Sequence, residues 1–263
     1  MTTNPTTEPA THQTTSQPAA ELDSRPPGHG PVPDRGALRL SAGLLLGGQL
    51  LYILITQLHA GGDANDHREI FLHYAGSGDW KGVHVGQFLA MTVMVAGLLA
   101  FGSALGPALK GRATAAIRAV ATSASTLAGV ALALYAALQA VDGVGNQQVD
   151  AAWEHATGAD KTARFASAEA MRWLEWGMRS YHDYALGFAL LGFAAAAAAV
   201  GRIAVPKAVA WLMGASGVAY LAQGWVVGTQ GFSVADSDLI VAAWVLSLAW
   251  MGWLVAVTRR RAA

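Results

Sequence analysis

Residues 85–105 read VGQFLAMTVMVAGLLAFGSAL, a run without one ionisable side chain. A helix needs about 20 apolar residues to cross a hydrocarbon core of about 30 Å at about 1.5 Å per residue. Five other stretches are similar, so we expect membrane helices at about 38–58, 85–105, 115–140, 184–203, 208–228 and 239–258. The period-two alternation of a membrane β-barrel is absent. The sequence therefore predicts an all-α membrane protein, a bundle of six transmembrane helices embedded in a lipid bilayer.

The composition excludes several classes of protein. Hydrophobic residues make up 53% of the 263-residue chain and charged residues only 13%, which is too apolar for a water-soluble domain. The formal net charge is zero, and no basic tract interleaved with aromatic residues occurs, so we expect no nucleic-acid partner. The chain has no cysteine, which rules out disulfides, thiolate metal sites and iron–sulfur clusters. The motifs GxSxG, GxxxxGK[ST] and HExxH are also absent.

The ends of the chain differ from its middle. Residues 1–36 hold seven of the nine prolines and few apolar side chains, which predicts a disordered cytoplasmic tail. Residues 37–258 form the predicted membrane domain, with outer loops at about 59–84, 141–183 and 229–238, and residues 259–263 form a basic terminus. The tail, the terminus and the short loops hold 11 of the 17 basic residues, which marks the cytoplasmic side. We therefore expect a multi-pass plasma-membrane protein with both termini in the cytoplasm.

The long outer loops predict an extracytoplasmic helical cap. Asp63 and Asn65 are candidate N-caps for a short helix in the first loop. In the second loop, Asp160 is a candidate N-cap for a longer helix that runs into the fourth membrane helix. On that helix Glu175 and Arg179 have the i,i+4 spacing of an ion pair.

Histidines are confined to one face of the predicted bundle. Two of the eight lie in the tail, and the other six, His59, His67, His73, His84, His155 and His182, lie in outer loops or at outer helix ends. Imidazoles are also at ease at a wet interface, so this distribution alone does not define a site.

Four of the outer residues are expected at the same depth. His59 ends the first helix, His84 begins the second, Asp142 ends the third and His182 begins the fourth. Such a set can bind a divalent transition metal, and two imidazoles can bind haem. Gln87 and Gln139 lie one turn from His84 and Asp142, where we expect them to give hydrogen-bonding support. The sequence thus predicts a cofactor site formed by His59, His84, Asp142 and His182.

Two other functions stay open, and no catalytic residue is indicated. The same polar groups are expected to line an outer vestibule if the protein is a small-solute permease or channel, with a path past Gln49 and Ser216. A structural or partner-binding membrane protein requires neither cofactor nor path. The small-residue steps Gly43/Gly47 and Ala210/Gly214 predict close helix packing and permit a homodimer.

Four short segments carry a resemblance to a known group of proteins. They read DHREIFLHY (66–74), GVHVGQ (82–87), QAVDG (139–143) and EAMRWLEWG (169–177). The chain resembles uncharacterised multi-pass membrane proteins of high-GC bacteria over about residues 38–258. That family carries no assigned activity, so the resemblance implies an architecture and points to the outer segments without implying a reaction.

Overall fold

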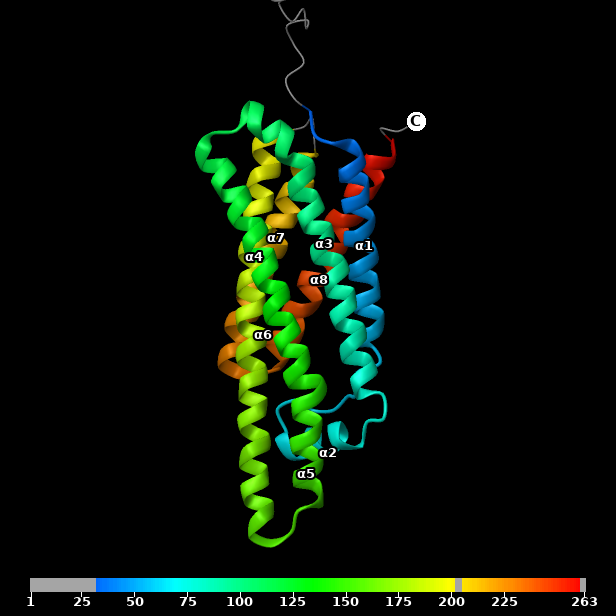
Figure 1. Ribbon diagram of the computed structural model, residues 1–263, viewed down its shortest axis with the longest axis vertical. Coiled ribbons are helices and arrows are strands. Elements are labelled where there is room, and N and C mark those ends of the chain that lie inside the picture. The colour runs from blue at the N-terminus through cyan, green and yellow to red at the C-terminus, as the bar shows by residue number, and fades with distance from the viewer. Residues whose placement is uncertain (1–31, 202–204, 261–263) are drawn as a thin grey trace, which may run out of the picture.

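The computed structural model describes residues 32–201 and 205–260, and every regular element in those ranges is helical. The elements are α1 (Arg35–Thr56), α2 (His67–Gly76), α3 (Trp80–Arg112), α4 (Ala115–Ala140), η1 (Val141–Asn146), α5 (Gln147–His155), α6 (Gly158–Val200), α7 (Lys207–Gln230) and α8 (Val234–Arg260). The long helices run side by side along one axis (Figure 1). The start of α1 and the end of α8 lie at one end of this bundle, and α2 and α5 lie at the other.

Five segments are long and apolar enough to cross a membrane. They are Arg35–Thr56, Trp80–Gly111, Ala115–His155, Gly158–Val200 and Val234–Arg260. The helix α7 is not among them. The prediction of an all-helical membrane protein is therefore supported, with five candidate spans where the sequence predicts six.

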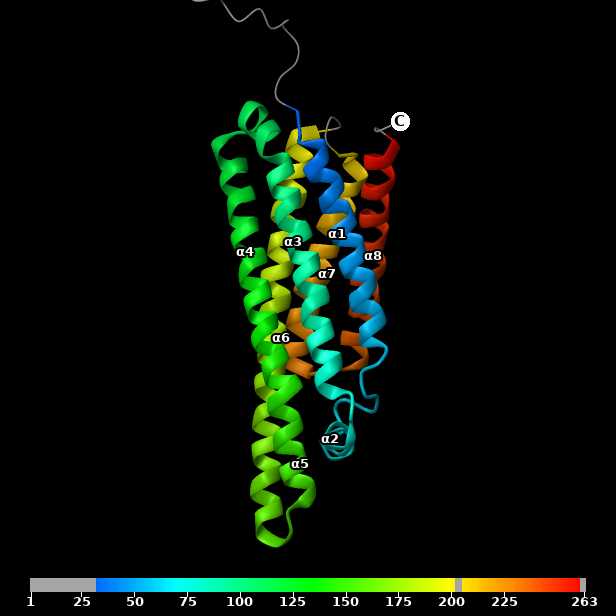
Figure 2. The same cartoon turned by 45° about the vertical axis from the view of Figure 1, so that its right-hand side comes forward.

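Two helices project far beyond the others. With 43 residues, α6 is about 65 Å long, roughly twice the thickness of a hydrocarbon core. The helix α4 continues through the π-helical turn η1 into α5, and together they form a long hairpin with α6 (Figure 2). The prediction that the second-loop helix runs unbroken into the fourth membrane helix is confirmed, but the prediction that Asp160 is its N-cap is wrong, because the helix begins at Gly158 after Thr157. An apolar cluster that includes Phe71, Trp80 and Trp153 joins α2 to this hairpin.

Some helix boundaries differ from the predicted ones. The helix α1 begins at Arg35, within the predicted tail, because the Asp34 side chain accepts hydrogen bonds from Gly36 N and Ala37 N. Residues 1–31 of that tail lie outside the described residues. The helix α2 begins after Asp66, whose carboxylate caps it, and the prediction that Asp63 or Asn65 is the N-cap is wrong.

Glycines allow the helices to approach closely, although one predicted pair has no such role. A Cβ atom on Gly48 would lie 2.7 Å from Met94 N of α3, and one on Gly187 would lie 2.8 Å from Gly217 O of α7. Beside Gly48, the Cβ positions of Gly43 and Gly47 have no atom of the described residues within 4 Å. These two glycines line a groove of about 370 Å³ between α1 and α8. The predicted homodimer through this step stays a prediction.

Replacing Gly48 with alanine is expected to destabilise the bundle. The new methyl group meets the α3 backbone, so the helices must separate, and overpacking of this kind costs about 1–3 kcal/mol. The matched control is Gly47→Ala, where the methyl group meets open space and the gain in helix propensity is about 1 kcal/mol. Denaturation in detergent measures both variants. Equal denaturation midpoints in Gly48→Ala and Gly47→Ala would contradict the close approach of α1 to α3.

Candidate metal centre

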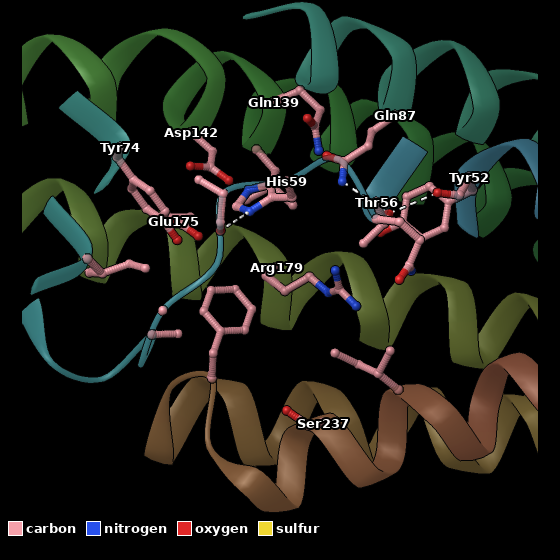
Figure 3. Close-up of a pocket in the computed structure, with 18 of the residues that line it drawn as sticks. Tyr52, Thr56, His59, Tyr74, Gln87, Gln139, Asp142, Glu175, Arg179 and Ser237 are labelled. Atoms are coloured by element: carbon pink, nitrogen blue, oxygen red, sulfur yellow. Dashed lines mark hydrogen bonds between the residues drawn. The ribbon is translucent and has the colours of Figure 1, made fainter. Parts of the chain in front are cut away.

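Three of the predicted site residues lie together where the bundle meets the projecting hairpin. His59 follows the end of α1, His84 lies in the second turn of α3, and Asp142 lies in η1. One ligand atom from each residue lies within 4.8 Å of the other two. His59 and Asp142 border the same cavity (Figure 3). The fold thus brings two imidazoles and one carboxylate, the triad below, from three elements to one point.

Hydrogen bonds fix which nitrogen of each triad imidazole is free. His84 Nδ1 lies 2.7 Å from the Trp80 carbonyl oxygen, and His59 Nδ1 lies 3.0 Å from the Ala60 carbonyl oxygen. A carbonyl oxygen only accepts, so each Nδ1 carries a proton and donates it. In the neutral rings Nε2 therefore keeps its lone pair. Histidines that bind metals commonly donate their other ring N–H in this way.

The free nitrogen of His84 faces a carboxylate oxygen. Its Nε2 atom lies 3.0 Å from Asp142 Oδ2. Two buried acceptors at this distance need a positive charge, supplied by a second proton on the imidazole or by a cation that both bind. Ligands at about 2.0–2.2 Å from one tetrahedral ion lie about 3.4 Å apart. His84 and Asp142 are therefore spaced for a shared ion, and His59 needs a shift on the order of 1 Å.

Neighbouring residues hold Asp142 in place. The Trp80 indole Nε1 donates to the Asp142 carbonyl oxygen at 2.7 Å, and Asn146 Nδ2 donates to Asp142 Oδ1 at 3.0 Å. The other carboxylate oxygen, Asp142 Oδ2, faces His84. A Cβ atom on Gly143 would lie 2.6 Å from His84 Cβ, so only glycine permits this approach of η1 to α3. Single π-helical turns are frequent at functional sites.

A buried ion pair lies behind Asp142. Arg172 Nη1 donates to Glu175 Oε2 at 2.6 Å, and Arg172 Nη2 donates to the Ala64 carbonyl oxygen at 3.1 Å. Asn146 Nδ2 also donates to Glu175 Oε2 at 2.6 Å, so one amide joins the Asp142 and Glu175 carboxylates. Arg172 is fully buried. It balances the charge of Glu175 and ties the loop that carries His59 to α6.

The electrostatic environment keeps His59 neutral. Its burial lowers the pKa of His59 below the usual value of about 6.5, with a further lowering from His84 and an opposing contribution from Asp142. At neutral pH the ring therefore has no proton on Nε2 to compete with an ion.

A cavity of about 590 Å³ opens beside the triad. Besides His59 and Asp142 its wall includes Glu175, and Arg179 extends into it from α6 (Figure 3). Two atoms of the Arg179 guanidinium are engaged: Nε donates to Asp183 at 2.9 Å and Nη2 donates to Gln223 at 2.8 Å. This volume is in the range of small-molecule sites.

The other predicted site residues have different surroundings. Gln87 and Gln139 both line the cavity. Gln87 Nε2 donates to Thr56 Oγ1 at 3.1 Å, and Gln139 Oε1 is buried with no hydrogen-bond partner among the described residues. His182 lies apart from the triad in the α4–α6 contact. There its Nδ1 donates to the Ala131 carbonyl oxygen at 2.9 Å, and its ring packs on Tyr135.

Sequence reasoning missed several residues that support the triad. Trp80 was not among the predicted site residues, but it is buried and its indole donates to the Asp142 carbonyl oxygen. The expected Glu175–Arg179 pair is wrong, because Glu175 pairs with Arg172 and Arg179 pairs with Asp183. The sequence could have indicated the role of Asn146, because Asn146 follows Asp142 by four residues and this spacing places both side chains on one helical face.

No protein family, curated protein or solved structure matches this chain. The resemblance to membrane proteins of high-GC bacteria stays a prediction.

Proposed function

We propose that this protein is a six-span plasma-membrane protein that binds one divalent transition-metal ion through His59, His84 and Asp142. The observation that carries the proposal is the meeting of His84 Nε2 and Asp142 Oδ2 at 3.0 Å, with the Nδ1 proton of the ring committed to a carbonyl oxygen. Two imidazoles and one carboxylate suit catalytic Zn²⁺ or non-haem Fe²⁺. Three protein ligands leave a coordination position open, and the cavity offers space for it.

The triad favours a bare ion over haem. Two imidazoles on one haem iron bind from opposite sides of the porphyrin ring. The His59 and His84 rings instead contact each other with centroids 5.2 Å apart, and Asp142 occupies the same space. A porphyrin has no room between them.

Elemental analysis and an absorption spectrum of the whole chain, purified in mild detergent without added metal, test this proposal. We expect one zinc or iron per chain and no Soret band. A Soret band would favour haem. A metal-free protein that also fails to take up added Zn²⁺ or Fe²⁺ would overturn the proposal.

The lowered pKa of His59 predicts how stability depends on pH. Above about pH 6.5 the ring is neutral in the folded and the unfolded chain. As the pH falls below this value, the unfolded chain binds a proton before the folded one, so stability decreases. With metal removed by a chelator, the loss of unfolding free energy between pH 7.5 and 5.5 is expected to be smaller in His59→Gln than in the natural protein.

Denaturation in detergent at the two pH values measures this difference. The matched control is His155→Gln, which changes an exposed histidine at the end of α5. An equal pH dependence in the natural protein and in His59→Gln would contradict the lowered pKa.

The sixth span in this proposal is α7. It has 24 residues and packs closely on α6 through glycines. Trp211 and Trp225 are exposed on its two halves, about 21 Å apart along the axis, as expected for two aromatic belts. Four basic residues, Arg39, Lys110, Lys207 and Arg259, belong to the start of α1, the end of α3, the start of α7 and the end of α8. These helix ends lie at one end of the bundle (Figure 1), which supports placing that end in the cytoplasm.

The absence of cysteine makes the topology testable with single substitutions. Lys207→Cys and Thr229→Cys place exposed thiols at opposite ends of α7. A membrane-impermeant maleimide is expected to label Thr229→Cys in intact cells and Lys207→Cys only after permeabilisation. Labelling of both from outside would contradict a membrane-spanning α7, and the reverse pattern would contradict the orientation.

The structure gives less support to a permease. A path past Gln49 and Ser216 would have to continue through the half of the bundle near the termini. That half is filled by Leu45, Leu98 and Phe101, each at most 1% exposed. The cavity beside Leu45 and Leu98 has a volume of only about 10 Å³, room for at most about one water molecule.

A further inference from the structure

The cavity beside the triad reaches the surface between two helices. On one side its wall is formed by Thr56 and Gln57 from the end of α1, and on the other by Ser237 and Val241 from α8. Gln57, Ser237 and Val241 are exposed, and Val241 has an exposed fraction of 57%. Both α1 and α8 are candidate membrane spans. The opening therefore lies on a side of the bundle that a bilayer would cover.

The cavity wall is charged near the triad and apolar on the side of α8. Near the triad it carries His59, Asp142 and Arg179, whereas the α8 side carries Ile240, Val241 and Trp244. Figure 3 shows the charged and polar side chains converging on the interior from α1, α3, η1 and α6. A ligand that fits this wall has a polar head and an apolar tail.

The net charge of the triad with its bound ion determines which head group the ligand can carry. With both imidazoles neutral, Asp142 contributes one negative charge and a divalent ion two positive charges. Glu175 is paired with Arg172, and Arg179 with Asp183. The loaded site thus has one positive charge in excess, and a monoanion in the open coordination position would neutralise it.

We infer that the cavity takes a single-chain amphiphile with a monoanionic head, such as a long-chain carboxylate, from the outer leaflet through the gap between α1 and α8. The head binds at the ion, so this part rests on the proposed metal site. The tail lies along Ile240 and Val241 and extends into the bilayer. The route between the helices depends only on the shape of the cavity.

The test uses the whole chain in nanodiscs and palmitate with a photoreactive diazirine on its tail. Zinc content is measured on the same samples. Val241→Trp narrows the opening, and the matched control Val245→Trp changes a residue on the same helix that is equally exposed, at 61%, but lies outside the cavity wall. Unlabelled palmitate, hexadecanol and butyrate compete for labelling. Hexadecanol retains the tail without the charge, and butyrate retains the charge without the tail.

We expect saturable labelling that palmitate displaces at a concentration at least about tenfold lower than hexadecanol or butyrate. Hexadecanol lacks the charge-assisted contact, which contributes at least this factor, and butyrate lacks the apolar burial of the tail, about 0.8 kcal/mol per buried methylene group. Val241→Trp is expected to reduce labelling several-fold and Val245→Trp to leave it unchanged. Equal labelling of the two variants, or labelling that no competitor displaces, would overturn the inference and indicate bulk lipid contact only.

Removing zinc and measuring zinc uptake distinguish failure of this inference from failure of the proposed metal site. Removing zinc with a chelator is expected to abolish the preference for palmitate over hexadecanol and to leave the Val241→Trp effect in place. A protein that takes up no zinc but still differs between the two tryptophan variants would refute the metal site and retain the route. A zinc-loaded protein without a preference for palmitate would retain the metal site and refute the anionic ligand.

Discussion

His84→Ala is expected to lower the affinity for Zn²⁺ by more than about 100-fold, because even loss of a group that only supports a ligand costs about 10–100-fold. The substitution removes the ligand nearest to Asp142, at 3.0 Å, and leaves two protein ligands. Competition with a chromophoric chelator measures the affinity in detergent. We expect the natural protein to bind one ion and the variant to lose it at micromolar free zinc.

Two further variants separate ligand loss from general disruption. His73→Ala removes an exposed histidine of α2 outside the triad and is expected to retain zinc. Gly143→Ala keeps all three ligands but would place a methyl group 2.6 Å from His84 Cβ, so it is expected to weaken binding. Unchanged affinity in His84→Ala would refute the triad as the site.

Arg172→Met is expected to have the largest effect on stability. Arg172 is 0% exposed, and its Nη1 atom lies 2.6 Å from Glu175 Oε2. Removing one member of a buried ion pair leaves an uncompensated charge and costs about 3–5 kcal/mol. The Arg172→Met/Glu175→Gln double variant removes both charges and is expected to recover most of this loss.

Denaturant titration in detergent measures these differences in unfolding free energy. The matched control is Arg164→Met, which breaks an exposed pair with Asp160 on the same helix and is expected to cost less than about 1 kcal/mol. Similar losses in Arg172→Met and Arg164→Met would contradict a fully buried pair. A double variant that is no more stable than Arg172→Met would also contradict a fully buried pair.

The helical bundle could be predicted from the sequence because each membrane span depends on the apolar character and length of its own segment. A run such as 85–105 is apolar in every register, so its length alone predicts a span. The segment of α7 was also predicted as a span, at 208–228, although it is not among the five segments of the structure that are apolar enough to cross a membrane. Its polar face is satisfied by α6 and α8 in the folded bundle, for example where Gln223 accepts from Arg179.

The site was only partly accessible for a different reason. Equal depth in the bundle predicted that His59, His84 and Asp142 meet, and these three lie together. His182 was expected at the same depth, but depth does not fix the direction of a side chain around its helix. In the structure His182 points at the Ala131 carbonyl of α4. The π-helical turn that directs Asp142 leaves no mark in the apolar periodicity, because one extra residue per turn rotates the face without changing composition.

X-ray absorption at the metal edge of the purified, zinc-loaded protein tests the central claim most directly. The account predicts four light ligands at about 2.0–2.2 Å, with the outer-shell scattering of two imidazole rings, reduced to one ring in His84→Ala loaded with zinc in excess of its weakened affinity. A spectrum without imidazole scattering, or one that His84→Ala leaves unchanged, would contradict a metal centre formed by His59, His84 and Asp142.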